Sequence, residues 1–330
     1  MTQVSSFAIL NVPKRKERRR KMLFVDKKQV KVTKFPNGEL LVDTTLLRKL
    51  KDGRTIYLPA LLYKYDGSDS IQELMLACDY LGEADYHLYI SYLPYERMDR
   101  VQEDNCYSLQ TFMRQLQAVF KGKSIHIYEL HSHVTDEPIK GKVHKMHTSA
   151  GIALQVIEQG GVDVICYPDK GARKRFNSLG EDAGKPQIYC EKVRDFSTGK
   201  IMGLDLITDG YDMTGKRVLI VDDLCSAGGT FYYTAQKLRE AGASKVDLVV
   251  THMEHNVLNG KILQTTDEKT VIDHIYCMNT MGNMDELGLL HVAKNLTVYD
   301  VLDAVFLPMN SYKEIILDKE DVKNYVGHAI

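Results

Sequence analysis

Short apolar stretches alternate with amphipathic stretches along most of the chain. The apolar stretches have the length of single β-strands, and the amphipathic ones repeat their apolar residues at the helical period. This alternation is typical of α/β folds with a mainly parallel sheet. The predicted strands cover residues 55–63, 86–92, 124–130, 162–167, 187–191, 217–221, 245–251 and 274–278, and the predicted helices cover residues 71–81, 108–120, 149–159, 230–241 and 298–306.

The order of elements is similar in the two halves of the chain, although no clear sequence repeat connects them. A chain of 330 residues is long enough for two ordinary domains. We therefore expect one α/β domain over residues 1–147 and a second over residues 148–330. Parallel sheets bind ligands at the carboxyl ends of their strands. The strand ends expected to carry functional residues are those at residues 130, 167, 191 and 221.

The composition is that of an ordinary globular protein, with 44% hydrophobic and 26% charged residues. The net charge of −1 gives no overall field that would hold a polyanion such as DNA. One basic run, residues 14–21 (KRKERRRK), matches patches that bind nucleic acid or mark nuclear import. It lies between two strand-like pieces at residues 7–12 and 22–25, which favours a solvated loop, hairpin end or interface patch instead. Nucleic acid is therefore not an expected partner.

The six cysteines are scattered singly and form no CxxC pair, so neither a zinc site nor a redox dithiol is predicted. Several of them lie in apolar runs, where a reduced cysteine behaves as a small buried hydrophobe. The sequence has no signal-like apolar region near its start and no apolar stretch of about eighteen residues. We expect a cytoplasmic, reduced protein without a membrane partner.

The most specific segment is residues 218–231 (VLIVDDLCSAGGTF). It predicts a buried strand that ends at Asp222 and Asp223, followed by a glycine-rich turn that opens a helix. Gly228, Gly229 and Thr230 would present N–H donors to a phosphate at the helix N-terminus. The two carboxylates would repel phosphate, so they suit sugar hydroxyls, with or without a metal. The alternative is an ordinary strand–turn–helix junction, but the acids before GGT favour a phosphate site.

This segment resembles the ribosyl phosphate-binding loop of phosphoribosyltransferases, and most of the chain resembles the ribose-phosphate diphosphokinase family. The resemblance covers roughly residues 30–280 and implies two tandem phosphoribosyltransferase-like domains, each a mainly parallel sheet flanked by helices. It also implies Mg²⁺-dependent transfer of the β,γ-diphosphate of ATP to a ribosyl phosphate. Seven blocks occur in the family's order: FPNGE at 35–39, PYERMDR at 94–100, ELH at 129–131, YPDKG at 167–171, EKVR at 191–194, TH at 251–252 and NT at 279–280.

The resemblance assigns the metal and the catalytic cations. ATP needs a divalent cation, and His131 and Asp169 are the implied Mg²⁺ ligands, with water completing the shell. Imidazole is a less usual Mg²⁺ ligand, so His131 contacts either the metal or the phosphates of ATP. Lys192 and Arg194 are expected on one side of a strand, where they would stabilise the transferring diphosphate. Residues 195–212, rich in Gly, Asp and Thr, are predicted to form a loop that closes over ATP.

The resemblance also implies an adenine site in the first block. Phe35 offers a ring for stacking on the adenine base, and Asn37 and Glu39 offer polar groups for its edge. In the family this loop reaches the site of a neighbouring subunit, so a homo-oligomer is implied.

Further ATP contacts are implied in the second and third blocks. Arg97 and Asp99 are expected near the adenosine or its phosphates, together with His131, and Arg100 supports them. The basic run at residues 173–175 adds positive charge near Asp169 or faces solvent.

The phosphate loop departs from the family pattern D-[ST]-[GA]-G-T at two positions, Ser226 and Ala227. The loss of an acid and a hydroxyl would suit a phosphate that carries a substituent, as in ADP-ribose, and phage-encoded relatives that act on ADP-ribose are similar in this respect. Met98, in place of a glutamine, and residues 132–136 depart as well. We expect ribose 5-phosphate as the acceptor, giving PRPP and AMP, with ADP-ribose in NAD salvage as the alternative. The predicted ribosyl phosphate site comprises Asp222, Asp223, Ser226, Ala227, Gly228, Gly229 and Thr230.

Two other classes are disfavoured. A regulatory homologue without catalysis would not need the retained metal and cationic positions. A phosphoribosyltransferase that consumes PRPP would not need the ATP-side blocks that contain Phe35 and Arg97.

Overall fold

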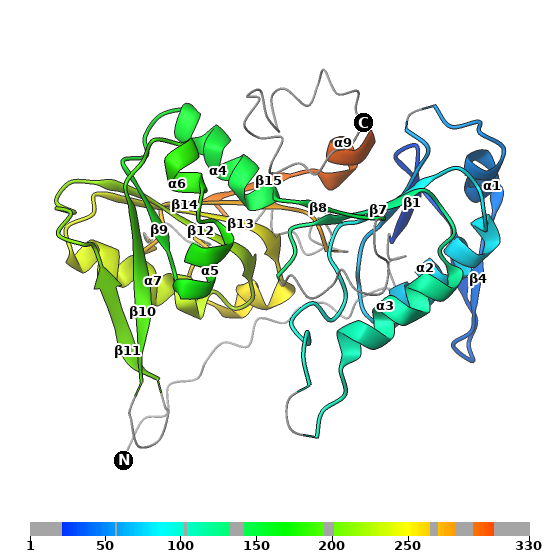
Figure 1. The fold of residues 1–330 in the computed structure, drawn as a ribbon, viewed down its shortest axis with the longest axis horizontal. Coiled ribbons are helices and arrows are strands. Elements are labelled where there is room, and N and C mark those ends of the chain that lie inside the picture. The colour runs from blue at the N-terminus through cyan, green and yellow to red at the C-terminus, as the bar shows by residue number, and fades with distance from the viewer. Residues whose placement is uncertain are drawn as a thin grey trace, which may run out of the picture.

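The computed structural model describes residues 22–56, 58–101, 104–131, 142–194, 201–264, 270–281 and 293–306, without the side chains of residues 192–194 and 201–202. The strand predicted at residues 7–12, the basic run at 14–21 and the departure at 132–136 lie outside this part of the chain. Within it, two large sheets lie next to each other (Figure 1).

The sheet of the N-terminal half has the strand order β2-β1-β5-β6-β7-β8. Strands β5 to β8 are parallel, β1 is antiparallel to β5, and β2 folds back on β1. A separate hairpin, β3–β4, precedes the first helix. The strands of this half are β1 (Leu23–Val25), β2 (Lys28–Gln29), β3 (Val32–Lys34), β4 (Leu40–Val42), β5 (Ala60–Tyr63), β6 (His87–Ile90), β7 (Ser124–Tyr128) and β8 (Val143–Met146).

The sheet of the C-terminal half has the order β11-β10-β9-β12-β13-β14-β15. All its neighbouring strands are parallel except the β10–β11 pair. The predicted mainly parallel α/β architecture is therefore confirmed. These strands are β9 (Val164–Tyr167), β10 (Gln187–Arg194), β11 (Ile201–Ile207), β12 (Arg217–Cys225), β13 (Lys245–Met253), β14 (His274–Met278) and β15 (Leu296–Tyr299).

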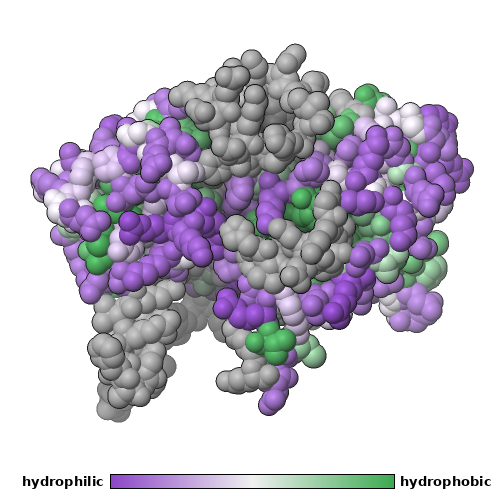
Figure 2. Space-filling view, in the orientation of Figure 1, coloured by the Kyte–Doolittle hydropathy of each residue, from purple (hydrophilic) through white to green (hydrophobic). Residues whose placement is uncertain are grey.

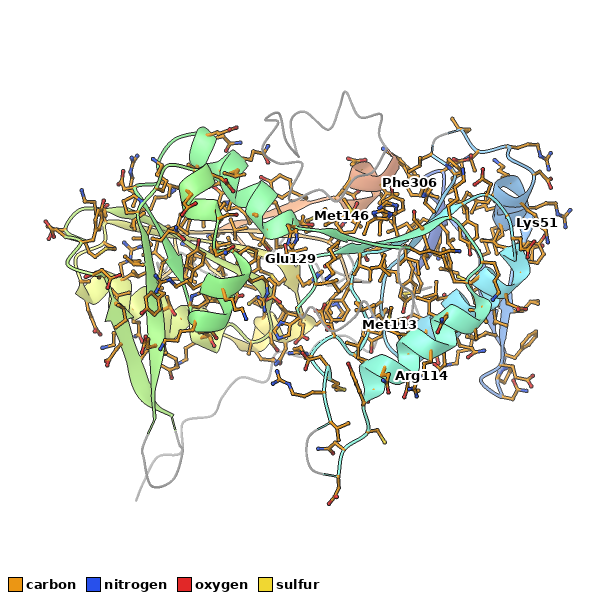
Figure 3. The ribbon with its side chains drawn as sticks, in the orientation of Figure 1. Lys51, Met113, Arg114, Glu129, Met146 and Phe306 are labelled. Atoms are coloured by element: carbon orange, nitrogen blue, oxygen red, sulfur yellow. The ribbon has the colours of Figure 1, made fainter. Side chains whose placement is uncertain are left out.

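Helices cover the sheets through apolar stripes. In α3, buried Leu109, Phe112, Met113 and Leu116 recur at helical spacing. Figure 3 shows Met113 on the side of α3 that faces the sheet and Arg114 on the opposite side. The helices are α1 (Thr45–Lys51), α2 (Ser68–Leu81), α3 (Ser108–Val119), α4 (Thr148–Glu158), α5 (Lys170–Arg175), α6 (Leu179–Asp182), α7 (Gly229–Glu240), η2 (His255–Asn259) and α9 (Val301–Phe306).

The two sheets share one hydrophobic core. A single cluster of buried residues joins Phe24 and Leu62 of the N-terminal half to Ile165 and Val221 of the C-terminal half. Helix α9 belongs to this cluster and packs against β5 of the other half. The predicted division at residue 147 falls between β8 and α4, and it stays a prediction.

Three histidines lie side by side on the N-terminal sheet. The His126 ring stacks between Tyr89, at a centroid distance of 4.5 Å, and His144, at 4.8 Å. Ser124 Oγ lies 2.8 Å from His126 Nε2 and 2.6 Å from His87 Nδ1. Burial, followed by the charges of His144 and His87, lowers the pKa of His126 to about 3. The buried ring is therefore neutral at physiological pH.

Two predicted segments differ from the structure in their type of secondary structure. The predicted helix at residues 298–306 begins as strand β15 and becomes helical only at Val301. Its first part is a strand because Leu296 and Val298 face one core while Tyr299 faces the other, which is a period of two. The predicted loop at residues 195–212 contains β11, which pairs antiparallel with β10 because Leu204 and Leu206 alternate toward the core. Residues 195–200 of that loop lie outside the described chain.

The visible face of the molecule is mostly hydrophilic, with scattered hydrophobic side chains (Figure 2). Across the described ranges, every helix is too short or too polar to cross a bilayer.

Candidate active site

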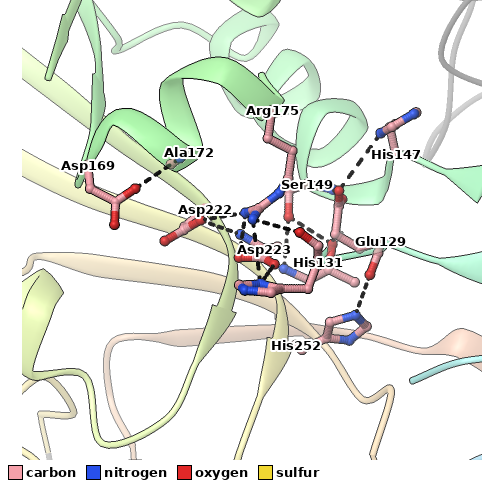
Figure 4. A network of polar contacts seen from close by, with 11 residues as sticks. Glu129, His131, His147, Ser149, Asp169, Ala172, Arg175, Asp222, Asp223 and His252 are labelled. Carbon is pink, nitrogen blue, oxygen red and sulfur yellow. Dashed lines mark hydrogen bonds and ion pairs between the residues drawn. The ribbon is translucent and has the colours of Figure 1, made fainter. Parts of the chain in front are cut away.

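Charged side chains converge where the carboxyl end of β7, in one sheet, meets the carboxyl ends of β12 and β13, in the other (Figure 4). The structure brings together three of the predicted site residues here: His131, Asp222 and Asp223. It adds Arg175, which we had not assigned to the site.

Asp222 and Asp223 lie inside β12 and do not follow it. We predicted that the strand ends at Val221, but its pairing with β13 continues to Cys225. The ladder extends past the acids because β13 itself runs on to Met253 and supplies backbone partners. Asp223 is 2% exposed. A buried carboxylate of this kind needs charged or hydrogen-bonding partners from other elements.

Arg175 supplies positive charge to both acids. Its Nη1 lies 3.1 Å from Asp222 Oδ1 and 2.7 Å from Asp223 Oδ1. Its Nη2 donates to the backbone carbonyl of His131 at 3.0 Å. One guanidinium therefore joins the end of β12 to the segment that follows β7.

The interpretation of residues 173–175 as a solvated run is wrong for Arg175, whose side chain is 13% exposed. It holds for Arg173 and Lys174, which are exposed. Arg175 follows buried Ala172 by three positions and precedes buried Phe176, so it lies on the inward stripe of α5. That spacing is a signal in the sequence that distinguishes Arg175 from its neighbours.

His131 is oriented by Asp223. Its Nδ1 lies 2.6 Å from Asp223 Oδ2, so a neutral His131 donates from Nδ1 and keeps Nε2 as an acceptor. A carboxylate behind one ring nitrogen is the arrangement that orients metal-binding histidines. The His131 side chain is 37% exposed, so the ring retains an accessible surface.

The two acids differ in how readily they ionise. Burial, followed by the charge of Asp223, raises the pKa of Asp222 well above its usual range. Burial acts in the same direction on Asp223, but the hydrogen bond from His131 and the charge of Arg175 outweigh it and hold the pKa of Asp223 below its usual range. The negative charge of the pair therefore resides mainly on Asp223.

Asp169 caps helix α5. Its Oδ1 accepts a hydrogen bond from the backbone N–H of Ala172 at 3.0 Å. Figure 4 places Asp169 on the Asp222 side of the cluster and His131 on the Asp223 side. The two predicted metal ligands therefore flank the pair of acids.

In the part of the chain that the structure describes, no group of three or more His, Cys, Asp or Glu side chains is arranged to enclose a metal ion. Mg²⁺ usually binds through one or two carboxylates, several waters and substrate phosphates. An oriented His131 and a carboxylate at Asp169 are side chains of the kind that suit such an ion, which proteins hold with few ligands of their own.

The phosphate loop follows β12 and opens α7. Gly228 has φ of +80°, a backbone conformation that favours glycine, and a Cβ there would lie 2.6 Å from Ile262 Cδ1 and displace that side chain. No described side chain caps α7. The N–H groups of its first turn, at Gly229 and Thr230, therefore have no acceptor within the helix and suit an anion. Both residues are exposed.

The outer side of the loop meets the segment after β13. Asn256 Nδ2 donates to Ser226 Oγ at 3.4 Å, and a Cβ on Gly260 would lie 1.9 Å from the carbonyl oxygen of Ala227. Polar, cationic and aromatic side chains belong to α7, to η2 and to the segment just after η2, which border the loop: Tyr232, Tyr233, Asn256, Asn259 and Lys261.

Lys192 and Arg194 lie at the end of β10, but their side chains are outside the described part of the structure. The backbone register shifts between Val193 and Arg194, where the partner moves from Gly203 to Ile201. The extra residue, Met202, lies on β11, so the prediction that both side chains lie on one side of β10 stays a prediction.

The predicted adenine-binding residues lie elsewhere. Phe35, Asn37 and Glu39 form the turn of the β3–β4 hairpin, and all three are exposed. Asn37 Nδ2 donates to Glu39 Oε2 at 2.8 Å. Figure 1 shows the hairpin at the far end of the N-terminal half, away from β12. Within one chain, the structure does not bring these residues to the His131 cluster.

The second ATP-side block contacts the C-terminal half. Arg97 forms an ion pair with Glu254, which follows β13, and the backbone N–H of Glu254 donates to Cys225 just before the phosphate loop. Asp99 is buried and accepts from Arg100 Nε at 3.1 Å. Arg97 and the phosphate loop therefore share a neighbour.

A buried polar network lies behind the cluster. Glu129 Oε2 accepts from the backbone N–H of Ser149 at 2.6 Å and from Thr251 Oγ1 at 3.2 Å. The His252 ring lies 3.0 Å from the carbonyl oxygen of Glu129 and 2.9 Å from Thr280 Oγ1. The TH and NT blocks thus join the strand ends of the two sheets.

Glu96 is a second residue that we did not assign to the site. It is 1% exposed and stands where the family pattern has alanine. Burial, followed by the charge of Asp223, raises the pKa of Glu96 well above its usual range. The departure of residue 96 from the family pattern P-Y-A-R is the signal in the sequence that could have identified it.

The sequence of this chain is similar to a known domain family and to known enzymes. A phosphoribosyl transferase domain model matches residues 144–276. Ribose-phosphate pyrophosphokinase from Pyrococcus abyssi is 32% identical over 228 residues, covering 68% of this chain and 75% of that protein. The enzyme of the same name from Pyrococcus furiosus is 31% identical over 227 residues, covering 68% and 77%.

A solved structure has the same fold. The crystal structure of phosphoribosylpyrophosphate synthetase from Mycobacterium smegmatis aligns with a TM-score of 0.65, covering 88% of this chain and 91% of that one, at 18% identity. The predicted enzyme class, a diphosphotransferase, is confirmed by the sequence relatives. The chain belongs to the ribose-phosphate pyrophosphokinase family.

Proposed function

We propose that this protein transfers the β,γ-diphosphate of ATP to the anomeric hydroxyl of ribose 5-phosphate, giving PRPP and AMP. One observation carries the proposal: an anion-binding helix start directly follows two acids that are joined, through Asp223, to His131 of the other sheet. The loop suits the 5-phosphate, and the acids suit the ribose hydroxyls. The name of the relatives, ribose-phosphate pyrophosphokinase, describes transfer of a diphosphate to a ribose phosphate.

We propose Mg²⁺ as the cofactor, held by His131 through Nε2 and by Asp169. When bound, the ion would offset the charge of the triphosphate. Asp223 fixes the tautomer of His131 that leaves Nε2 directed away from the acids. Asp169 keeps its place because it also caps α5.

We propose Lys192 and Arg194 as the catalytic cations. Both belong to β10, whose parallel neighbour β9 leads directly to Asp169. Positive charges there would stabilise the negative charge that develops on the α-phosphate oxygen as AMP leaves.

We propose that the adenine site is completed by a second copy of this chain. The hairpin of Phe35, Asn37 and Glu39 exposes an aromatic ring and two polar side chains, away from the cluster of its own subunit. Arg97, Asp99 and His131 would contribute from the subunit that holds the phosphates. A homo-oligomer follows from this arrangement.

ADP-ribose is a second candidate acceptor. It is favoured by the side chains at the outer side of the phosphate loop, where Lys261 Nζ lies 5.5 Å from the Tyr232 ring and Tyr233 is 59% exposed. A second phosphate and an adenosine could use such cationic and aromatic groups.

The test is AMP release from ATP and Mg²⁺ with ribose 5-phosphate and ADP-ribose as competing acceptors. Formation of AMP together with PRPP supports the first proposal, and preferential consumption of ADP-ribose supports the second. ADP as the main product would overturn both. If no AMP is released with either acceptor, the chain would be assigned to the class of regulatory homologues without catalysis.

A further inference from the structure

Arg175 is the described cation that contacts both acids of the cluster. Its guanidinium reaches Asp222, Asp223 and the carbonyl oxygen of His131 with two nitrogens. Burial would lower its pKa, but four surrounding acids, led by Asp223 and Asp222 and followed by Glu129 and Asp169, raise it. A side chain so enclosed by acids has no ordinary surface role.

The three contacts belong to different parts of the proposed reaction. Asp222 and Asp223 lie where the acceptor's ribose would bind, and His131 lies on the ATP side. They come from β12 and from the segment after β7, which belong to different sheets. Without Arg175, the buried charge of Asp223 would lose its cationic partner, and the backbone carbonyl of His131 would lose its hydrogen bond from α5.

We propose that Arg175 is a positioning residue for the transfer: it fixes Asp222 and Asp223 for the acceptor ribose and, through the carbonyl of His131, holds the ATP-side histidine at a set distance from the same acids. This inference rests on the proposed function. The planar fork is essential to it, because a guanidinium can bind two separate acceptors in fixed directions, whereas an ammonium acts as a point charge.

The fork and the charge can be separated by two variants. Arg175→Lys keeps a positive charge beside the acids but cannot contact them and the His131 carbonyl together. Arg175→Gln removes the charge as well. Arg173→Gln is the matched control, since it removes one positive charge from the exposed face of the same helix, where Arg173 stacks on Tyr189 at 4.2 Å.

Arg175→Lys should leave the KM for ribose 5-phosphate close to the wild-type value while kcat falls by about 10²-fold, the cost expected when a reacting group is displaced by roughly 1 Å. Arg175→Gln should also raise that KM by about tenfold, because the buried Asp223 carboxylate then lacks its cationic partner and the two acids no longer hold one geometry. Arg173→Gln should change neither constant.

Thermal unfolding and direct binding of ribose 5-phosphate are measured on each variant. Wild-type kcat in Arg175→Lys would overturn the proposal. So would a parallel loss of Tm, binding and kcat in both variants, which is the result of a purely structural arginine. If Arg175→Gln does not fold, Arg175→Lys decides alone through its separation of kcat from KM. Failure of the wild type to release AMP would instead reject the proposed function, and binding by the variants remains measurable in that case.

Discussion

The two ligand sides of this protein are built differently. On the acceptor side, Asp222, Asp223 and Arg175 are largely buried, and they are assembled with the phosphate loop within one chain. On the adenine side, the Phe35 hairpin is exposed and far from that cluster. The residues of the acceptor side are therefore positioned by folding of the subunit, whereas the adenine side depends on which surface the hairpin contacts.

The largest effect is expected at the cations between the two sides. Lys192→Ala or Arg194→Ala should lower kcat by ~10²–10³-fold with a much smaller change in KM for either substrate, since their contacts would strengthen as charge develops. Steady-state kinetics of AMP release measures this. Lys237→Ala, on the exposed side of α7, serves as the control. Near-normal turnover in both variants would remove these residues from the mechanism.

Asp223→Asn attacks the acceptor side at its centre. The amide cannot compensate Arg175 or hold the His131 tautomer, so kcat/KM should fall by about 10²-fold. The variant should also be less stable, by ~3–5 kcal/mol if the buried charge of Arg175 is left uncompensated. Denaturant unfolding and AMP release measure the two effects. An active variant with unchanged stability would contradict the assembled picture of this side.

Phe35→Ala tests the adenine side. KM for ATP should rise by about tenfold, since stacking of one base contributes ~1–3 kcal/mol. Stability should hardly change, because Phe35 is 43% exposed. Mixing inactive Asp223→Asn subunits with Phe35→Ala subunits sharpens the comparison, because some sites would then combine an intact hairpin with an intact cluster. If mixing restores no ATP affinity, the hairpin serves its own chain.

The smallest effect is expected on stability at acid pH, and it arises from His126. Its pKa is lowered from 6.5 to about 3, so it stays neutral in the folded protein while the unfolded chain takes up a proton. Its contribution is therefore full above pH ~6.5 and is lost as pH falls toward 3, by up to ~1.4 kcal/mol per pH unit. His126→Gln should flatten the acid dependence of unfolding between pH 6.5 and 4.5. If the free energy of unfolding depends on pH equally in the variant and the wild type, the lowered pKa of His126 is contradicted.

Much of the fold could be predicted because its elements are locally encoded. The α3 stripe of Leu109, Phe112 and Leu116 and the apolar run of β14 appear almost residue by residue in the predicted ranges. Strand β11 was predicted as a loop because Gly203 and Asp205, residues that are rare in strands, alternate with its few apolar residues, and pairing with β10 decides its conformation.

The candidate site was predictable only where it is contiguous in sequence. The phosphate loop is one segment, so its glycines and acids identify it directly. The contacts of His131 with Asp223 and of Glu129 with Thr251 join residues about a hundred positions apart. No local pattern specifies such pairs, because packing of the two sheets creates them. The family blocks include these residues, but they do not show which of them are in contact.

The shared core has a consequence for synthesis of the chain on the ribosome. The apolar face of the N-terminal sheet, with Phe24 and Leu62, packs with α9, which is translated late. At ~5–20 residues per second, the roughly 240 residues between Leu62 and Val301 take on the order of 10–50 s. During that interval the nascent sheet has an uncovered hydrophobic surface. Chains interrupted before residue 301 would keep it, and they should be preferred clients of chaperones and proteases.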